Sequence, residues 1–258
     1  MTSVVERKIV DLELAGKAFI VTGGSTGLGL AGAQALVEEG ANVVVVGRDP
    51  DRLSTAVDSL GDSARGVDGD LSQAATIANA ISVAKSEFGR LDGAFISYGG
   101  PPAGGAETFS DEDLLLSMQL VALNPIRVAR EVASELTEGG SILVLSSSTA
   151  KEVTVGMTGS NIARPGLEAY AKELATVVGP RGVRVNVIVP GIYATERLAY
   201  LDAARGFSGA EREAPRVPLR RLGEPIELGR VAAFLLSNAA SYVNGASVTV
   251  DGGRRNTL

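Results

Sequence analysis

Short apolar runs alternate with longer amphipathic segments along almost the whole chain, and this alternation most constrains the fold. The apolar runs span residues 17–24, 42–48, 64–67, 91–97, 141–147, 183–191 and 246–253. Apolar residues at helical spacing fill residues 28–41, 51–60, 73–88, 111–136, 161–178 and 227–237. Such alternation is typical of a parallel sheet covered by helices on both faces. We therefore predict one α/β domain over residues 1–258, with its ligand beyond the carboxyl ends of the strands.

The composition narrows the chemistry that this domain can perform. The 258 residues include no cysteine and no histidine, which excludes thiol catalysis and removes both the usual metal ligands and the usual general base. The net charge of -6 argues against nucleic acid and anionic membranes as partners. No apolar run approaches the ~18 residues of a membrane span, and the first residues lack a signal-peptide core. We expect a cytoplasmic protein that acts on a small-molecule substrate and holds no metal.

A glycine-rich loop follows the first predicted strand and runs directly into a helix. Its sequence is TGGSTGLG, residues 22–29, with Gly23, Gly27 and Gly29 at the spacing TGxxxGxG. Glycines let a backbone approach a pyrophosphate closely, and the helix N-terminus offers free N–H groups and the positive end of a dipole. The loop predicts a dinucleotide site. The alternative is a tight turn without a ligand.

Two positions after the second and third strands refine the choice of dinucleotide. The second strand ends in Gly47 and Arg48, where NAD-specific proteins usually carry an acidic residue. A guanidinium can pair with a 2′-phosphate, so Arg48 favours NADP(H); Asp49 follows at once and leaves NAD(H) possible. Asp70, after the third strand, is an acceptor for an adenine amino group, and Asp70 or Ser72 also suits a helix N-cap.

Taken together, these features resemble the short-chain dehydrogenase/reductase family. The resemblance extends through GDL at residues 69–71, GGSILVLSSS at 139–148, RGVRVNVIVPGIYAT at 181–195, PLRRLGEPIELGRVAAFLLS at 218–237 and SYVNGASVTVDGG at 241–253. It implies a single-domain, doubly wound Rossmann fold with a seven-stranded parallel sheet, a nicotinamide cofactor, and commonly a homotetramer, with a homodimer as the alternative. The cofactor-binding residues that it implies are Gly23, Ser25, Thr26, Gly27, Leu28, Arg48, Asp70, Leu71, Ser97, Gly99, Arg164, Pro190, Gly191, Ile192 and Thr195.

The resemblance fails at the residues that move the proton. The family's catalytic serine matches Ser147, and thirteen residues later the family has a Tyr-x-x-x-Lys pair. This chain has Ser160 and Arg164 at those two positions. The family's helix asparagine aligns with Val121, three residues before Asn124, and its NNAG motif becomes ISYGG.

Ser147, Ser160 and Arg164 can stabilise negative charge but cannot act as an efficient acid. A serine hydroxyl is too weak an acid, and arginine does not deprotonate in proteins. The candidates for a replacement proton donor are Tyr193 and Tyr98, with Lys151 behind them.

Residues 196–222 resemble the family's substrate lid. Arg205, Arg212 and Arg216 within it either meet an anionic substrate or, as their acidic neighbours favour, belong to a solvated helix. Three functions remain in competition. The first is an NADP(H)-dependent oxidoreductase with a rearranged site; the second is a cofactor-binding protein without turnover; the third is non-redox chemistry of the halohydrin dehalogenase kind.

Overall fold

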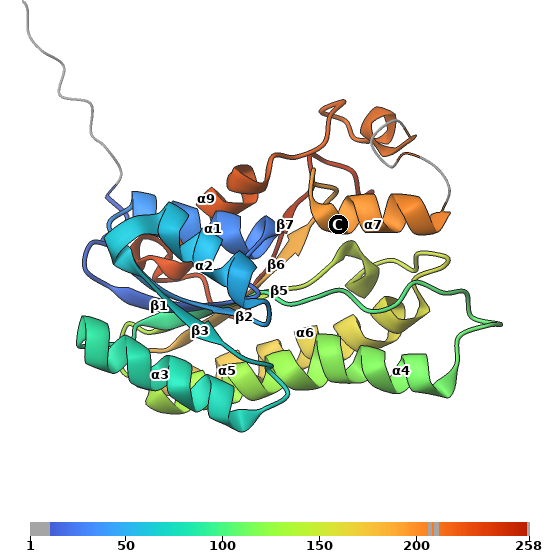
Figure 1. The fold of residues 1–258 in the computed structure, drawn as a ribbon. Coiled ribbons are helices and arrows are strands. Elements are labelled where there is room, and N and C mark those ends of the chain that lie inside the picture. Colours follow the sequence, from blue (N-terminus) through green and yellow to red (C-terminus); the bar gives the residue numbers. More distant parts are fainter. Residues whose placement is uncertain (1–10, 206–207, 209–211, 257–258) are drawn as a thin grey trace, which may run out of the picture.

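A computed structural model describes residues 11–205, 208 and 212–256. Seven parallel strands form one sheet in the order β3-β2-β1-β4-β5-β6-β7. This confirms the predicted fold class (Figure 1). The strands are β1 Ala18–Thr22, β2 Asn42–Gly47, β3 Ala64–Asp68, β4 Gly93–Ile96, β5 Ser141–Leu145, β6 Arg184–Pro190 and β7 Ser247–Val250.

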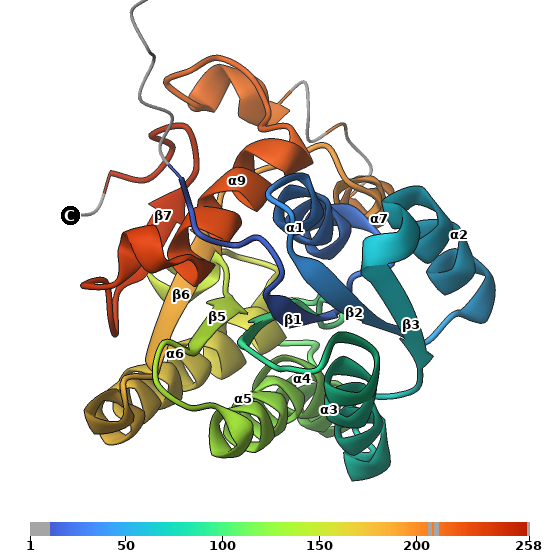
Figure 2. The same cartoon turned by 90° about the vertical axis from the view of Figure 1, so that its left-hand side faces the viewer.

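Helices cover both faces of this sheet. One face carries α1, α2 and α9, and the other carries α3, α4, α5 and α6, as the two views show (Figures 1 and 2). The helices span α1 Gly27–Glu38, α2 Pro50–Leu60, α3 Ala74–Phe88, α4 Asp111–Met118, α5 Asn124–Glu135, α6 Thr158–Val178, α7 Glu196–Arg205 and α9 Pro225–Leu236. No helix among the described residues is long and apolar enough to cross a membrane.

The central strands are apolar on both sides because both of their faces are covered. In β2, Val43, Val44 and Val45 are fully buried, as expected for strands between two helical layers. Each such side chain contributes about 1.5–3 kcal/mol by leaving water. The burial therefore explains the unbroken β-branched run seen in the sequence.

The strand order reverses between β1 and β4, so their loops diverge and leave a crevice at the carboxyl edge. The two loops touch at its floor. Thr22 Oγ1 donates a hydrogen bond of 2.7 Å to the carbonyl of Ser97, and Gly23 adopts φ +55° against the same carbonyl. A β-carbon at Gly29 would lie 2.1 Å from the carbonyl oxygen of Gly23, so only glycine permits this close packing of loop and helix.

The predicted helix over residues 111–136 is interrupted. A π-helical turn, Gln119–Leu123, separates α4 from α5, and the backbone N–H of Asn124 bonds to the carbonyl of Gln119. Pro125 gives the physical reason, since it has no N–H to donate to the carbonyl of Val121 four residues earlier. The prediction of one continuous helix is therefore wrong at this point. The signal, a proline directly after Asn124, was present in the sequence.

Candidate functional site

A cleft of about 720 Å³ lies at the carboxyl edge of the sheet. Its walls are the loops after β1, β2, β3, β4, β5 and β6, together with α7 and residues of α6. Every residue predicted for the cofactor lines it, namely Gly23, Ser25, Thr26, Gly27, Leu28, Arg48, Asp70, Leu71, Ser97, Gly99, Arg164, Pro190, Gly191, Ile192 and Thr195. The predicted catalytic residues Ser147, Ser160, Tyr193 and Tyr98 line the same cleft. The fold thus gathers residues that lie up to 172 positions apart, from Gly23 to Thr195.

The glycine loop presents the N-terminus of α1 to one end of the cleft. Thr26 is the N-cap, and its side chain makes no capping hydrogen bond, so the amides of the first turn have no side-chain acceptor. Gly27 adopts φ +56°, and a β-carbon placed on it would lie 3.8 Å from the Thr195 side chain. Free amides, a dipole end and a backbone without side chains suit a pyrophosphate. The residues present therefore fit a dinucleotide.

Arg48 and Asp49 follow β2 at the edge of this cleft. The Asp49 carboxylate accepts hydrogen bonds of 3.1 Å from the backbone N–H groups of Asp51 and Arg52, so it caps α2. The Asp49 carboxylate, which could otherwise bind the ribose 2′-hydroxyl of NAD(H), is therefore already hydrogen-bonded. Arg52 is engaged elsewhere, in an ion pair of 2.7 Å with Glu196 of α7.

Asp70 is exposed and lines the cleft, but it does not cap α3. Its Oδ1 accepts a hydrogen bond of 2.7 Å from the N–H of Ser72, and this bond is the main cause that lowers the pKa of the carboxyl. The N-cap of α3 is Gln73, so the expectation of Asp70 or Ser72 as cap is wrong. The turn holds Asp70 ionised beside Arg48, whose charge also lowers that pKa.

Three buried or half-buried groups meet at the other end of the cleft. Arg164 and Ser160 lie one turn apart on α6, and Arg164 Nε donates to Ser160 Oγ at 2.9 Å. Arg164 Nη1 donates to the hydroxyl of Tyr98 at 3.3 Å, and the guanidinium carbon lies 5.3 Å from the centre of the Tyr98 ring. A phenol and a buried cation are therefore in direct contact, although no sequence spacing announces the pair.

The electrostatics of Tyr98 are set by opposing effects. Burial raises the pKa of the Tyr98 hydroxyl to about 12, the Arg164 cation opposes this, and the Glu168 carboxylate adds to it. Tyr98 is therefore protonated at neutral pH and can donate. Ser147 lies in the loop after β5, and its Oγ accepts a hydrogen bond of 3.3 Å from the N–H of Thr149. Its own hydroxyl proton remains free to point into the cleft.

Tyr193 is less suited to proton transfer than the sequence implied. Its hydroxyl donates to the carbonyl of Val250 in β7 at 2.9 Å, its ring packs against Gly223, and it is 6% exposed. Burial raises the pKa of the Tyr193 hydroxyl, and nearby Glu227 adds to the rise. The geometry assigns Tyr193 to holding the loop after β6 against β7.

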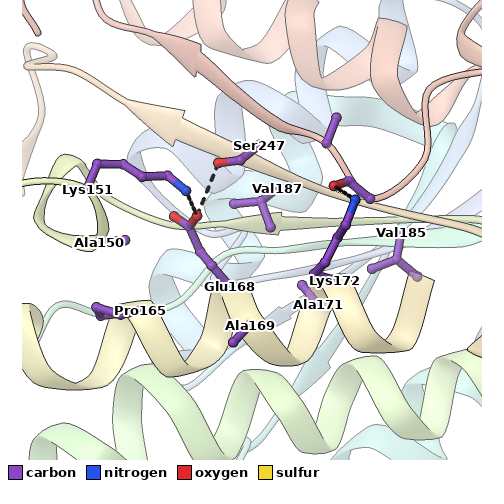
Figure 3. Close-up of a pocket in the computed structure, with 12 residues that line it drawn as sticks. Ala150, Lys151, Pro165, Glu168, Ala169, Ala171, Lys172, Val185, Val187 and Ser247 are labelled. Atoms are coloured by element: carbon purple, nitrogen blue, oxygen red, sulfur yellow. Dashed lines mark hydrogen bonds and ion pairs between the residues drawn. The ribbon is translucent and has the colours of Figure 1, made fainter. Parts of the chain in front are cut away.

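Lys151 does not line the cleft. It lines a second cavity of about 310 Å³ between α6 and the ends of β6 and β7 (Figure 3), where its ammonium pairs with Glu168. The expectation that Lys151 reaches the cofactor site is therefore wrong. The ion pair with the buried carboxylate of Glu168 on α6 holds Lys151 in this second cavity.

The segment resembling a lid closes one side of the cleft through α7. Arg197 Nη2 donates to the carbonyl of Pro101 at 2.8 Å and its guanidinium lies 5.0 Å from the Tyr200 ring centre. Of the three lid arginines, Arg216 pairs with Glu213, Arg212 has a partner, and the side chain of Arg205 lies outside the described residues. Within the described part of the chain, neither Arg212 nor Arg216 lines the cleft.

Arg254 and Asn124 line the cleft, although neither was among the predicted site residues. Arg254, near the C-terminus, lines the cleft and bonds to Glu152 at 3.3 Å and Glu213 at 3.1 Å. Asn124 lines it as well, with its Oδ1 2.5 Å from Gln119 Nε2. Long-range folding back of the tail has no local signal, whereas Asn124 could have been found from Pro125 and the π turn that it causes.

Comparisons with known proteins agree with this architecture. Residues 23–255 match the family model described as enoyl-(acyl carrier protein) reductase. The chain is 32% identical over 243 residues to the oxidoreductase AsL5 of Sarocladium schorii, covering 93% of this chain and 96% of the relative. It is 30% identical to the short chain dehydrogenase/reductase DmxR18 of a Cryptosporiopsis species, covering 95% and 97%. The crystal structure of L-sorbose reductase from Gluconobacter frateurii, complexed with NADPH and L-sorbose, superimposes with a TM-score of 0.86 at 27% identity, covering 96% and 100%.

Proposed function

Because the chain belongs to the short-chain dehydrogenase/reductase family and is an oxidoreductase acting on CH–OH or C=O groups, we propose that it uses NADP(H) at a rearranged catalytic site. A bound nicotinamide supplies or accepts the hydride. The residues of this chain would hold the dinucleotide, orient the substrate oxygen and move its proton. NAD(H) is the alternative cofactor, and the choice depends on Arg48.

NADP(H) is supported by the charges at the adenosine end. Arg48 is exposed at the cleft, while Asp49 is committed to capping α2. An exposed guanidinium beside a carboxylate that already caps a helix favours a 2′-phosphate over a 2′-hydroxyl. The solved L-sorbose reductase, at 27% identity, is complexed with NADPH.

The single observation that carries the proposed chemistry is the contact between Tyr98 and Arg164. It restores a phenol beside a cation. Arg164 stands at the position of the family's lysine, whereas Tyr98 comes from the loop after β4 and not from the position of the family's tyrosine. Tyr98 would donate the proton to the substrate oxygen, and Arg164 would stabilise the phenolate that remains. Ser147 and Ser160 would donate hydrogen bonds to the developing oxyanion. Arg164 would also contact the nicotinamide ribose.

The experiment is a screen of carbonyls with NADPH and of alcohols with NADP⁺, including L-sorbose, phenanthrenequinone and simple secondary alcohols. We expect cofactor consumption that equals product formation. The second candidate, a cofactor-binding protein without turnover, is favoured by the high pKa of Tyr98. Tight NADPH binding in calorimetry without any consumption would establish that second candidate instead.

A homotetramer, or a homodimer, is proposed from the apolar side chains that α4 and α6 expose. Leu115 is 70% exposed and Ile162 is 50% exposed, and the two helices contact each other. A larger apolar surface of this kind marks an interaction site. Sedimentation at several concentrations decides between the states.

A further inference from the structure

Glu168 is a buried carboxylate that the proposed chemistry does not use. It lies on α6, one turn beyond Arg164, and is 9% exposed. Taking a carboxylate out of water costs several kcal/mol unless it is paired and hydrogen-bonded. Such a group needs an explanation, because an apolar residue would fill the same space between α6 and the sheet.

The partners of Glu168 line two different cavities: one lines the cofactor cleft, and two line the second cavity. Oε1 accepts a hydrogen bond of 2.6 Å from Ser146 Oγ, and Ser146 is 2% exposed and is among the residues that line the cleft. Oε2 accepts from Ser247 Oγ at 3.1 Å and pairs with the Lys151 ammonium. Glu168, Lys151 and Ser247 all line the second cavity (Figure 3).

Exposure rises steadily along this chain of groups. Ser146 is buried, Glu168 is nearly so, and Lys151 keeps 35% of its side chain exposed. Among these three groups, the Glu168 carboxylate can accept a proton at one oxygen and release it from the other. A hydroxyl can take part too, because it gives its own proton while accepting another.

We propose that Ser146, Glu168 and the second cavity form a proton path between the cleft and solvent, and this rests on the proposed function. When an alcohol is oxidised, one proton leaves the substrate oxygen and must reach solvent. Ser146 accepts a proton from the cleft side and passes its own hydroxyl proton to Glu168. The resulting carboxylic acid releases that proton to water in the second cavity. Reduction runs the same transfers backwards and consumes one proton from solvent.

Several charged and polar groups surround Glu168 in the described part of the chain. Arg164 lies one turn before it on α6 and Lys172 lines the same cavity one turn after it, Lys151 approaches from the loop after β5, and Ser247 from β7. Tyr98, in the loop after β4, senses its charge. Lys151 pairs with the Glu168 carboxylate, the group that receives the proton in this proposal.

The test compares Glu168→Gln with Lys172→Met in the full chain. Glutamine keeps the shape and can still accept from Ser146, but it cannot carry a proton. Lys172 lines the same cavity, yet it bonds to the carbonyl of Gly245 instead, so its variant is the matched control. We expect kcat of Glu168→Gln to fall about tenfold or more, with a larger solvent deuterium isotope effect and unchanged NADPH affinity. Ser146→Ala should reproduce this loss, and Lys172→Met should not.

A second readout needs no turnover. Glu168 opposes ionisation of Tyr98, so Glu168→Gln should lower the pH midpoint of Tyr98 ionisation, followed by ultraviolet difference spectroscopy against a Tyr98→Phe reference. An unmoved midpoint would mean that the Glu168 carboxylate does not interact with Tyr98 in the cleft, which counts against the path.

The two proposals fail in different ways. If the unaltered protein turns over phenanthrenequinone or L-sorbose and Glu168→Gln matches it in kcat and isotope effect, the path alone is overturned. If the unaltered protein consumes no NADPH with any carbonyl, the proposed function falls and the path falls with it. Thermal unfolding of each variant separates loss of fold from loss of proton transfer.

Discussion

At the scale of single residues, Tyr98 occupies the position that decides the chemistry. Among the residues that line the cleft, its phenol contacts the buried Arg164 guanidinium, whereas the hydroxyl of Tyr193 donates to the carbonyl of Val250. We expect Tyr98→Phe to lower kcat by roughly 10²–10⁴ because a positioned acid is lost. NADPH affinity should stay within about twofold because the phenol is not part of the phosphate loop. Steady-state kinetics and calorimetry measure the two quantities.

The matched control for this change is Tyr193→Phe. It removes a hydroxyl of the same kind from a side chain that lines the same cleft. Its loss should lower the melting temperature, because a buried hydrogen bond to β7 disappears, while kcat changes far less. If Tyr193→Phe abolishes activity and Tyr98→Phe does not, the assignment of the two tyrosines is reversed.

Arg48 carries the preference for NADP(H). We expect Arg48→Ala to weaken NADPH binding by about tenfold to a hundredfold, the value of a charge-assisted contact, and to leave NADH binding unchanged. Arg65→Ala serves as control, because Arg65 pairs with Glu87 and does not line the cleft. Dissociation constants for both cofactors give the answer. If Arg48→Ala weakened the binding of NADH and NADPH equally, Arg48 would not recognise the 2′-phosphate.

At the scale of elements, the π turn between α4 and α5 sets the position of Asn124 in the cleft. Pro125→Ala supplies the missing N–H, so the segment should relax to a continuous α-helix. We expect the melting temperature to hold or rise and kcat to fall several-fold, since Asn124 rotates away. Pro50→Ala is the control, because Pro50 occupies the first turn of α2, where no N–H is needed. Unchanged kinetics for Pro125→Ala would make the turn merely structural.

The start of α9 gives the fold a measurable response to acid. Glu227 forms a capping box with Glu224 and a two-bond ion pair of 2.7 Å with Arg221. Arg221, followed by the Glu224 backbone, lowers the pKa of Glu227 to about 2. A lowered pKa in the folded state means stability that is present above about pH 4.5 and lost as the pH falls toward 2.

Glu227→Gln should therefore lower the free energy of unfolding at pH 7 by less than about 1 kcal/mol, because the pair is partly exposed. The melting temperature should fall slightly as a result. The difference from the unaltered protein should shrink as the pH falls below about 4.5 and should vanish below about pH 2. Calorimetric scans across that range measure it. A difference that persists at low pH would assign the effect to the shape of the side chain rather than to its charge.

Elements were predicted better than their interruptions. The seven strands and most helices follow from apolar runs and helical spacing, because covered strands must be apolar on both sides. The break at Gln119–Leu123 depends on one proline, and α6 begins at Thr158, earlier than the predicted start at residue 161. Both depend on packing and hydrogen bonding that a hydrophobic pattern does not encode.

At the scale of the whole molecule, the sequence located the cleft but not all of its contacts. The loops after each strand predicted its lining, because parallel strands deliver their carboxyl ends to one edge. The contact of Tyr98 with Arg164 joins residues 66 positions apart, and Arg254 contacts Glu152 and Glu213, which lie 102 and 41 positions before it. No local pattern announces such contacts, since they are set by how the loops pack after the sheet has formed.

The most direct test of the account follows the hydride itself. NADPH carrying deuterium on the nicotinamide carbon that donates the hydride is incubated with the unaltered protein and a carbonyl that it consumes, and the product alcohol is analysed by mass spectrometry. The account predicts one deuterium on the new carbinol carbon for each NADPH oxidised, and a much slower transfer by Tyr98→Phe. Tight binding of the labelled cofactor with no deuterium in any product would contradict it.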